Sequence, residues 1–218
     1  MNANRNVSER LYDAIHDAFG HFNRELFEGR LPPAIITLHR HRKFVGYFHA
    51  DQWQERDGEA KHHEIALNPE HLGRSPAEVL STLAHEMVHH EQHMFGKPTK
   101  SNPHNREWVG MMQDIGLEPF NAKDRGKPPT GRAVSHNIVP DGLFALSCER
   151  FLAANPDALG VFAIISEAAP KAKKRDLSKV KHTCPECEAN AWAKLGAKLI
   201  CGDCDEVMAA EDIEEEDA

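Results

Sequence analysis

Residues 75–96 have the sequence SPAEVLSTLAHEMVHHEQHMFG, and this stretch decides how the first half of the chain folds. Ser75, Pro76 and Glu78 form the pattern of a helix start, a capping box with proline at the first helical position. Apolar residues then recur at helical spacing and predict a buried stripe: Leu80, Leu83, Ala84, Met87 and Val88. Gly96 fits the C′ position that ends a helix. We therefore expect one amphipathic helix across this stretch.

The middle of this helix contains His85-Glu86-Met87-Val88-His89. Residues four apart lie one turn apart on the same face, so His85 and His89 can direct ring nitrogens at one tetrahedral zinc ion. Glu86 lies about 100° around the helix, beside the metal, where its carboxylate can pass a proton from a zinc-bound water to a leaving amine. The chain has 15 histidines, so chance can produce this pattern, and the helical context is what favours a metalloprotease site.

A catalytic zinc ion takes three protein ligands and leaves its fourth position open. His93 continues the stripe but lies about 12 Å from His85 along the helix axis, too far for both to bind one ion. His90 points away from the stripe. His104 is the predicted third ligand, and Glu107 is the alternative, because some zinc enzymes use a glutamate in this position.

His104 follows a polar turn and opens a second predicted helix. We expect Asn102 to cap this helix and Pro103 to occupy its first position. Its apolar face consists of Trp108, Met111, Met112 and Ile115. Gly116 and Leu117 fit its C-terminal end. If this helix returns alongside the first, His104 reaches the other two histidines.

Four cysteines form a second constellation near the end of the chain. Cys184 and Cys187 are followed, after thirteen residues, by Cys201 and Cys204, which is the spacing of a zinc ribbon. Four thiolates complete a tetrahedral site, so we expect a structural zinc rather than a redox pair or disulfides. Cys148 stands alone in the sequence and is interpreted as a small buried apolar residue.

The remaining patterns predict an α+β fold. An amphipathic N-terminal helix follows from apolar residues spaced by three and four: Val7, Leu11, Ile15, Ala18, Phe19, Phe22 and Leu26. Residues 31–39, 43–48 and 63–67 each have the composition of a strand. Residues 143–152 have a helical pattern. The expected order is therefore a helix, a small three-stranded sheet, the histidine-bearing helix, the second ligand-bearing helix and, later, the ribbon.

These features together resemble the SprT-like family of zinc metallopeptidases, which includes the Spartan proteases that digest proteins crosslinked to DNA. The resemblance runs from about residue 11 to residue 120. It is carried by Phe22-Asn23, Phe27, Leu31-Pro32, Gly46-Tyr47, Ile65-Ala66-Leu67-Asn68-Pro69, Leu83-Ala84-His85-Glu86-Met87-Val88-His89-His90, His104 to Trp108 and Ile115-Gly116-Leu117.

The resemblance implies a zincin-like minidomain in which His85, His89 and His104 bind zinc and Glu86 is the general base. It also implies that the edge strand next to the active-site helix pairs with an extended substrate backbone. Asn105 departs from the pattern, because such proteins often have glycine after the third histidine.

The sequence divides into four predicted segments. They are a metallopeptidase core (1–120), an irregular or helical connector (121–180) whose last part is a basic linker, a zinc ribbon (181–208) and an acidic disordered tail (209–218). His136 lies in the connector and has no role that the sequence predicts.

A net charge of −8 argues against a protein that coats nucleic acid by bulk charge. A basic run nevertheless precedes the ribbon: Lys171, Lys173, Lys174, Arg175, Lys179 and Lys181. It predicts either a solvated linker or a segment that contacts DNA phosphates together with the ribbon. No apolar run is long enough for a membrane span or secretory signal, so we expect a cytoplasmic protein with no membrane partner. The sequence carries no signal of an oligomeric state.

Two function classes follow. The first is a zinc endopeptidase with one catalytic and one structural zinc, acting on protein substrates that include proteins on DNA. The alternative is a non-catalytic zinc-binding module associated with nucleic acid or transcription. Glu86 favours the peptidase, because a purely structural site has no use for a carboxylate beside the metal.

Overall fold

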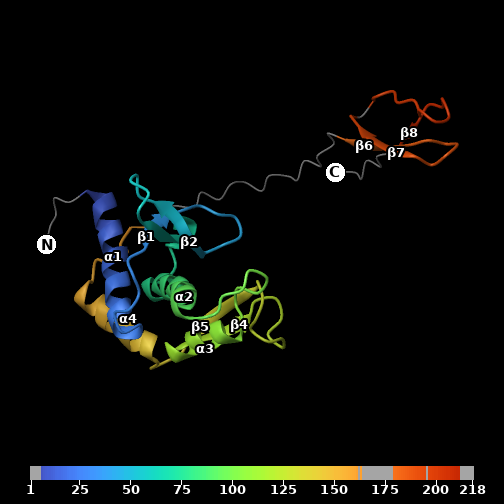
Figure 1. Ribbon diagram of the computed structural model, residues 1–218. Helices are drawn as coiled ribbons and strands as arrows, with labels where there is room; N and C mark the ends of the chain where they lie inside the picture. Colours follow the sequence, from blue (N-terminus) through green and yellow to red (C-terminus); the bar gives the residue numbers. More distant parts are fainter. Residues whose placement is uncertain (1–5, 162, 164–178, 195, 212–218) are drawn as a thin grey trace. The chain divides into compact units, whose positions relative to one another are not determined.

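The computed structural model describes residues 6–161, 163, 179–194 and 196–211, which form a mixed α+β protein (Figure 1). The chain divides into two compact units, Met1–Ile165 and Ser166–Ala218. The first unit contains the described helices, and the second contains the four free cysteines of the two C-x-x-C motifs. Within the described parts of the chain, no helix combines the length and the apolar character that crossing a membrane requires.

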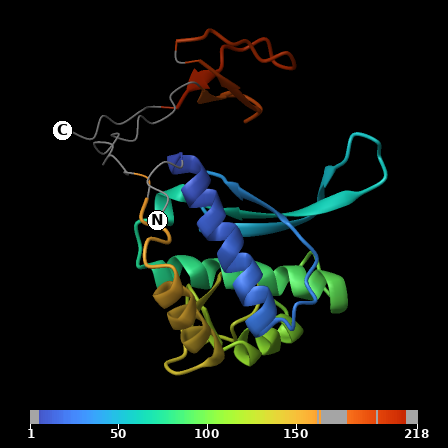
Figure 2. The ribbon, with the colours of Figure 1, turned by 90° about the vertical axis from the view of Figure 1, so that its left-hand side faces the viewer.

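The first unit contains helices, one 3-10 turn and two small sheets. Its helical elements are α1 (Val7–Leu26), η1 (Pro69–His71), α2 (Pro76–Phe95), α3 (Arg106–Asp114) and α4 (Leu143–Ala154). Its strands are β1 (Ile35–Leu38), β2 (Gly46–Gln54), β3 (Lys61–Leu67), β4 (Leu117–Asn121) and β5 (Val134–Ile138). Figures 1 and 2 show α2 in the middle, with the β1–β3 sheet on one side and α3 with the β4–β5 pair on the other.

The predicted N-terminal helix is confirmed as α1, and it packs against α4. Asn6 caps α1 in a capping box with Glu9. The buried ring of Phe22 contacts Phe144 and Phe151 of α4, at centroid distances of 5.4 and 6.1 Å. Since α4 contributes to the same core, the first compact unit extends well past residue 120, where the sequence predicts the end of the metallopeptidase core.

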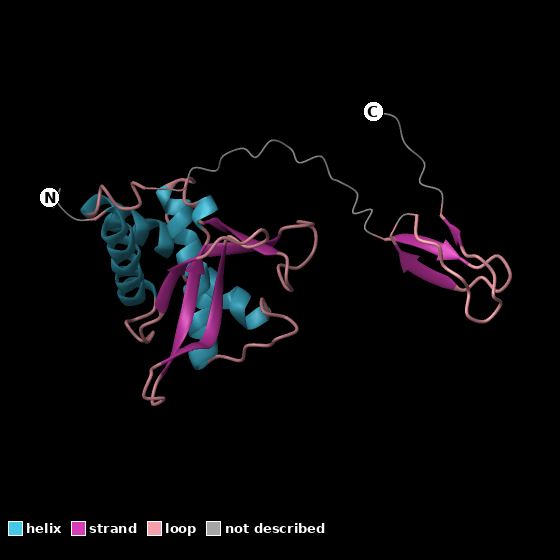
Figure 3. Cartoon of the chain, turned by 90° about the horizontal axis from the view of Figure 1, so that it is seen from above, coloured by secondary structure: helices cyan, strands magenta, loops and turns pink. Residues whose placement is uncertain are grey.

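The three predicted strands form one sheet with the order β1-β3-β2. β1 runs parallel to β3, and β2 runs antiparallel to it with an irregularity between His49 and Trp53. The predicted bounds of β2 (43–48) differ from the observed ones, because the strand begins at Gly46 and continues to Gln54. Its last residues are mostly exposed and polar, so they show no apolar pattern that would predict a strand. Figures 2 and 3 show the resulting β2–β3 hairpin and the helices beside it.

The predicted start of α2 is confirmed. Ser75 Oγ accepts the Glu78 backbone N–H at 3.3 Å, and the Glu78 carboxylate accepts the Ser75 N–H at 3.0 Å. The end differs slightly from the prediction, because Gly96 is the C-cap itself and has extended rather than left-handed backbone. A Cβ on Gly96 would lie 2.9 Å from Glu107 Oε2, so the close approach of this carboxylate accounts for the glycine.

The predicted start of the second helix is wrong. α3 begins at Arg106, and its N-cap is Asn105, whose side chain accepts the Trp108 backbone N–H at 3.0 Å. Asn102 is not available as a cap because its Oδ1 accepts the Gly131 N–H at 2.7 Å. His104 therefore lies before α3, in an isolated β-bridge with Gly131, rather than at the helix start with Pro103 in its first turn.

The predicted end of this helix is confirmed. Gly116 follows the C-cap with φ +82° and leads directly into β4. β4 pairs antiparallel with β5, a hairpin that the sequence did not predict, and the register places Pro119 opposite His136.

The second unit is a small three-stranded sheet with the order β7-β6-β8, made of β6 (Val180–Thr183), β7 (Asn190–Ala193) and β8 (Ala209–Ala210). Its core contains Cys184, Cys201 and Met208. Since β8 pairs with β6, the first residues of the predicted acidic tail belong to this sheet. The rest of that tail (212–218) and most of the basic run lie outside the described residues.

One buried side chain fixes the loop that enters β2. Asn68 Nδ2 donates to the carbonyls of His41 and Phe44, at 2.8 and 2.9 Å, and its Oδ1 accepts the Glu70 N–H. We predict that Asn68→Ala lowers the free energy of unfolding by about 2–3 kcal/mol, because the loop loses three hydrogen bonds from one buried side chain. Urea unfolding followed by circular dichroism measures this. Asn137→Ala, at an exposed position, is the control, and equal losses in the two variants would contradict the prediction.

Candidate metal centres

The first unit brings together the three histidines that the sequence predicts as ligands. His85 and His89 lie one turn apart on α2, and His104 comes from the segment before α3. Their candidate ligand atoms all lie within 4.8 Å of one another. The three ring centroids are 4.9 to 5.5 Å apart. This spacing lets one ion contact all three imidazoles.

Two neighbours shape this cluster. His104 Nδ1 lies 2.6 Å from the Gly131 carbonyl, which only accepts, so Nδ1 carries the proton and Nε2 keeps its lone pair. Trp108 is fully buried, and its ring lies 4.4 to 5.0 Å from the three imidazole centroids. Because this buried ring replaces water beside the imidazoles, protonating any of them costs desolvation free energy.

The imidazoles are accordingly held in the form that binds metal. Burial and the neighbouring histidines lower the pKa of His85 well below its usual value and that of His89 to about 3. Burial also lowers the pKa of His104. Three uncharged nitrogen donors that converge on one point, with no fourth protein ligand in the group, fit the ligand set of a catalytic zinc ion.

The alternative third ligand, Glu107, is engaged elsewhere. Its exposed carboxylate accepts hydrogen bonds from the Lys97 backbone N–H and from Gln92 Nε2, both at 2.7 Å. These bonds lower the pKa of Glu107. The residue closes the turn after α2 and does not belong to the histidine cluster.

The other histidines of α2 lie away from the cluster. His90 is fully buried beside Phe48 and His63, at ring-centroid distances of 5.4 and 5.0 Å. His93 also contacts His63, at 5.0 Å. Both therefore pack against the sheet side of α2, as expected for residues that do not bind the same ion as His85.

Glu86 is buried beside the first residue of β2. Burial raises the pKa of Glu86 to about 8. A Cβ on Gly46 would lie 3.0 Å from Glu86 Oε1 and 3.0 Å from both Thr82 Cγ2 and the Ala66 carbonyl oxygen. Only a glycine lets the strand pass this close to the carboxyl group without displacing its neighbours. The sequence signal for this contact was Gly46 itself, the first residue of the Gly-Tyr pair.

A fourth histidine touches the cluster from outside. His136 of β5 places its Nδ1 3.2 Å from His85 Nδ1 and its Nε2 3.0 Å from Ser81 Oγ. Burial and the nearby Arg74 charge lower the pKa of His136 to about 4. Sequence analysis missed this contact, because no local pattern marks a pairing across fifty-one residues of separation.

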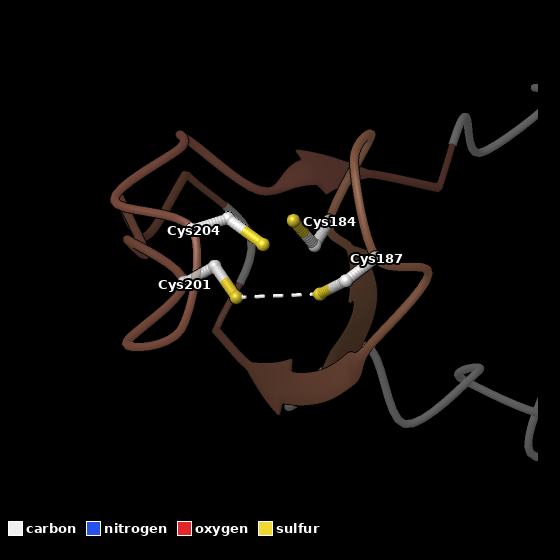
Figure 4. Close-up of side chains that lie close together, drawn as sticks. All are labelled: Cys184, Cys187, Cys201 and Cys204. Atoms are coloured by element: carbon white, nitrogen blue, oxygen red, sulfur yellow. Dashed lines mark hydrogen bonds between the residues drawn. The ribbon is translucent and has the colours of Figure 1, made fainter.

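The second unit brings all four predicted cysteines together. Figure 4 shows their sulfur atoms pointing toward one another, with Cys187 Sγ 3.6 Å from Cys201 Sγ. All four Sγ atoms lie within 4.8 Å of one another. Backbone N–H groups of Asp203 and Cys204 lower the pKa of Cys201 to about 7, whereas the Cys187 thiol raises the pKa of Cys204 to about 12. Four thiolates fit a closed, structural zinc site with no open position for chemistry.

We predict that His104→Ala removes one zinc ion per chain, whereas Glu107→Ala keeps it. Loss of a ligand should lower zinc affinity by more than the roughly 10- to 100-fold that removing an outer hydrogen-bond partner costs. Elemental analysis after dialysis against a weak chelator measures the stoichiometry. The reverse result for the two variants would assign the third position to the glutamate.

Cys184→Ser should remove a different zinc ion, because this cysteine belongs to the other cluster. We expect the second unit to lose its structure, since metal binding and folding are coupled in so small a domain. Nitrogen-15 NMR spectra of the amide groups of residues 180–210 report this loss. Full zinc content in this variant would show that the cysteines do not form the site.

Comparison with known proteins agrees with this geometry. Residues 15–127, more than half of the chain, match the model of the SprT-like family. An uncharacterized protein in the mucB 3′ region of Salmonella typhimurium is 44% identical over 36 residues, which are 16% of this chain and 49% of that protein, so the chain spans about half the length of that relative. No solved structure is significantly similar. Because the family match covers most of the first unit and includes the three histidines and Glu86, the protein belongs to the SprT-like family.

Proposed function

We propose that this protein is a zinc-dependent endopeptidase in which His85, His89 and His104 hold the metal and Glu86 is the general base. One observation carries the proposal: a buried carboxyl group lies on the same helix as two of three converging, uncharged imidazoles. A structural metal site gains nothing from that carboxyl group, whereas hydrolysis of a peptide bond requires it.

The residues of the chain divide the chemistry between them. When bound, zinc would polarise the attacking water and the scissile carbonyl. Glu86, which follows His85 on α2, takes the proton of the attacking water and delivers it to the leaving amine. Burial raises the pKa of the Glu86 carboxyl group, and a metal cation bound nearby would favour the carboxylate form that accepts the proton. Trp108 keeps bulk water away from one side of the histidines.

The sheet offers a place for the substrate backbone. Among the described strands, β2 pairs with β3 alone, so no described strand pairs with its other edge. Its first residue, Gly46, lies against Glu86. An extended peptide that adds to this edge therefore passes the general base, and main-chain pairing gives affinity with little sequence preference. This zincin-like arrangement of sheet, helix and metal is part of the proposal.

We also propose that proteins on DNA are among the substrates and that the second unit contacts the DNA. Trp192 of β7 is 62% exposed and stands opposite Lys181 in the β6–β7 register. An exposed indole beside a lysine suits stacking on unpaired bases with a phosphate contact nearby. The alternative function, a non-catalytic module associated with nucleic acid, rests on this same surface and gives no role to Glu86.

We predict that Glu86→Gln keeps the zinc and the fold but lowers cleavage of an unfolded protein by about 10²- to 10⁴-fold, because only the proton transfer is lost. The assay follows cleavage of casein by gel electrophoresis alongside zinc analysis. Glu107→Gln is the matched control, since it makes the same chemical change outside the cluster. Undiminished cleavage by Glu86→Gln would contradict the mechanism.

The same assay with single-stranded DNA tests the proposed partner. Faster cleavage of a DNA-binding protein when DNA is present would support work on DNA-bound substrates. Two zinc ions per chain without any cleavage, with or without DNA, would favour the non-catalytic module instead.

A further inference from the structure

We propose that His136 is a positioning residue that fixes the tautomer and orientation of His85, so that His85 Nε2 is directed to the metal. This inference rests on the proposed three-histidine metal centre. It concerns a residue of β5 that lies beyond the family match, which ends at residue 127. Its basis is a chain of hydrogen bonds that starts at a backbone carbonyl, which can only accept.

The chain of hydrogen bonds starts at a backbone carbonyl. Ser81 Oγ lies 2.9 Å from the Glu78 carbonyl oxygen, which can only accept, so the serine hydroxyl donates its single proton there. Ser81 Oγ also lies 3.0 Å from His136 Nε2. With the hydroxyl proton donated to the Glu78 carbonyl, Ser81 Oγ accepts from His136, and His136 Nε2 carries the proton.

The next step sets the tautomer of the metal ligand. An uncharged His136 with its proton on Nε2 has a lone pair on Nδ1. That Nδ1 faces His85 Nδ1 at 3.2 Å, and two ring nitrogens at this distance need one proton between them. His85 therefore carries its proton on Nδ1, which leaves the lone pair on Nε2. A metal-binding histidine needs this tautomer when it binds through Nε2.

A hydrogen bond from Nδ1 also fixes the tautomer of His104. Its Nδ1–H donates to the Gly131 carbonyl, so its Nε2 is also the free nitrogen. Both acceptors, Gly131 and His136, come from the stretch of chain that follows β4. The β4–β5 hairpin region therefore orients two of the three ligands from outside the cluster.

The geometry separates this role from that of a fourth ligand. Both ring nitrogens of His136 already have partners, His85 and Ser81. His136 is also absent from the group of residues whose ligand atoms converge. It supports the centre through His85 and does not complete it.

The test compares two variants of the full-length protein. His136→Phe keeps a ring of similar size but removes the acceptor, and we expect the affinity of the three-histidine site for zinc to fall about 10- to 100-fold. In His136→Asn, Oδ1 can take the place of Nδ1, so the affinity should stay near that of the wild type. Chelator competition measures zinc affinity without substrate, and the cysteine-bound zinc serves as the internal control.

Nitrogen-15 NMR of the imidazoles gives a second readout that a merely space-filling role would not change. We expect protons on His136 Nε2 and His85 Nδ1 in the wild type, and loss of that preference at His136 in Ser81→Ala. Ser81→Ala also serves if His136→Phe fails to fold, since it leaves the ring in place.

Three results would overturn the inference. They are equal zinc affinity in His136→Phe and the wild type, an equal loss of affinity in His136→Asn and His136→Phe, or a proton on His136 Nδ1. Because cleavage enters none of these measurements, failure of the proposed peptidase activity would be seen separately, in the Glu86→Gln comparison.

Discussion

The site depends on one constraint, which is that three imidazoles must stay uncharged while they lie close together beside the buried Trp108 ring. Each would repel the others if protonated, and burial makes any charge there costly. The same buried surroundings raise the pKa of Glu86 and lower that of His89, so both side chains favour their uncharged forms in the absence of a metal. A cation placed among the imidazoles would meet nitrogen lone pairs rather than protons. The low pKa values and the proposed zinc site therefore have the same physical cause.

The fold meets this constraint with few elements. α2 carries two of the proposed ligands, and its other faces contact the sheet and the rest of the core, so the helix proposed to bind the metal is also deeply packed. Gly46 lets β2 run directly against Glu86, which ties the edge strand to the chemistry. Asn68 holds the loop before that strand through the carbonyls of His41 and Phe44. Packing, strand register and reactivity are therefore coupled at one end of the sheet.

Local patterns explain which parts of this structure were predictable. Ser75 and the stripe of α2 depend on residues within one or two turns, and both predictions were confirmed. The predicted start of α3 was wrong, because Asn102 and Asn105 are both suitable caps. The choice between them depends on the hydrogen bond from Gly131, twenty-nine residues away, to Asn102. The contact of His136 with His85 and the pairing of β4 with β5 were missed for the same reason, since no nearby residue indicates either partner.

The residues matched by the family model end before two residues that form hydrogen bonds with the proposed ligands. Residues 15–127 contain the three histidines proposed to bind the catalytic zinc and Glu86, the proposed general base. The acceptors that orient His85 and His104 are His136 and Gly131, both beyond that range. Residues 15–127 alone would retain the ligands but lose the bonds that select their tautomers. The structural unit that forms the proposed metal site therefore includes the β4–β5 hairpin.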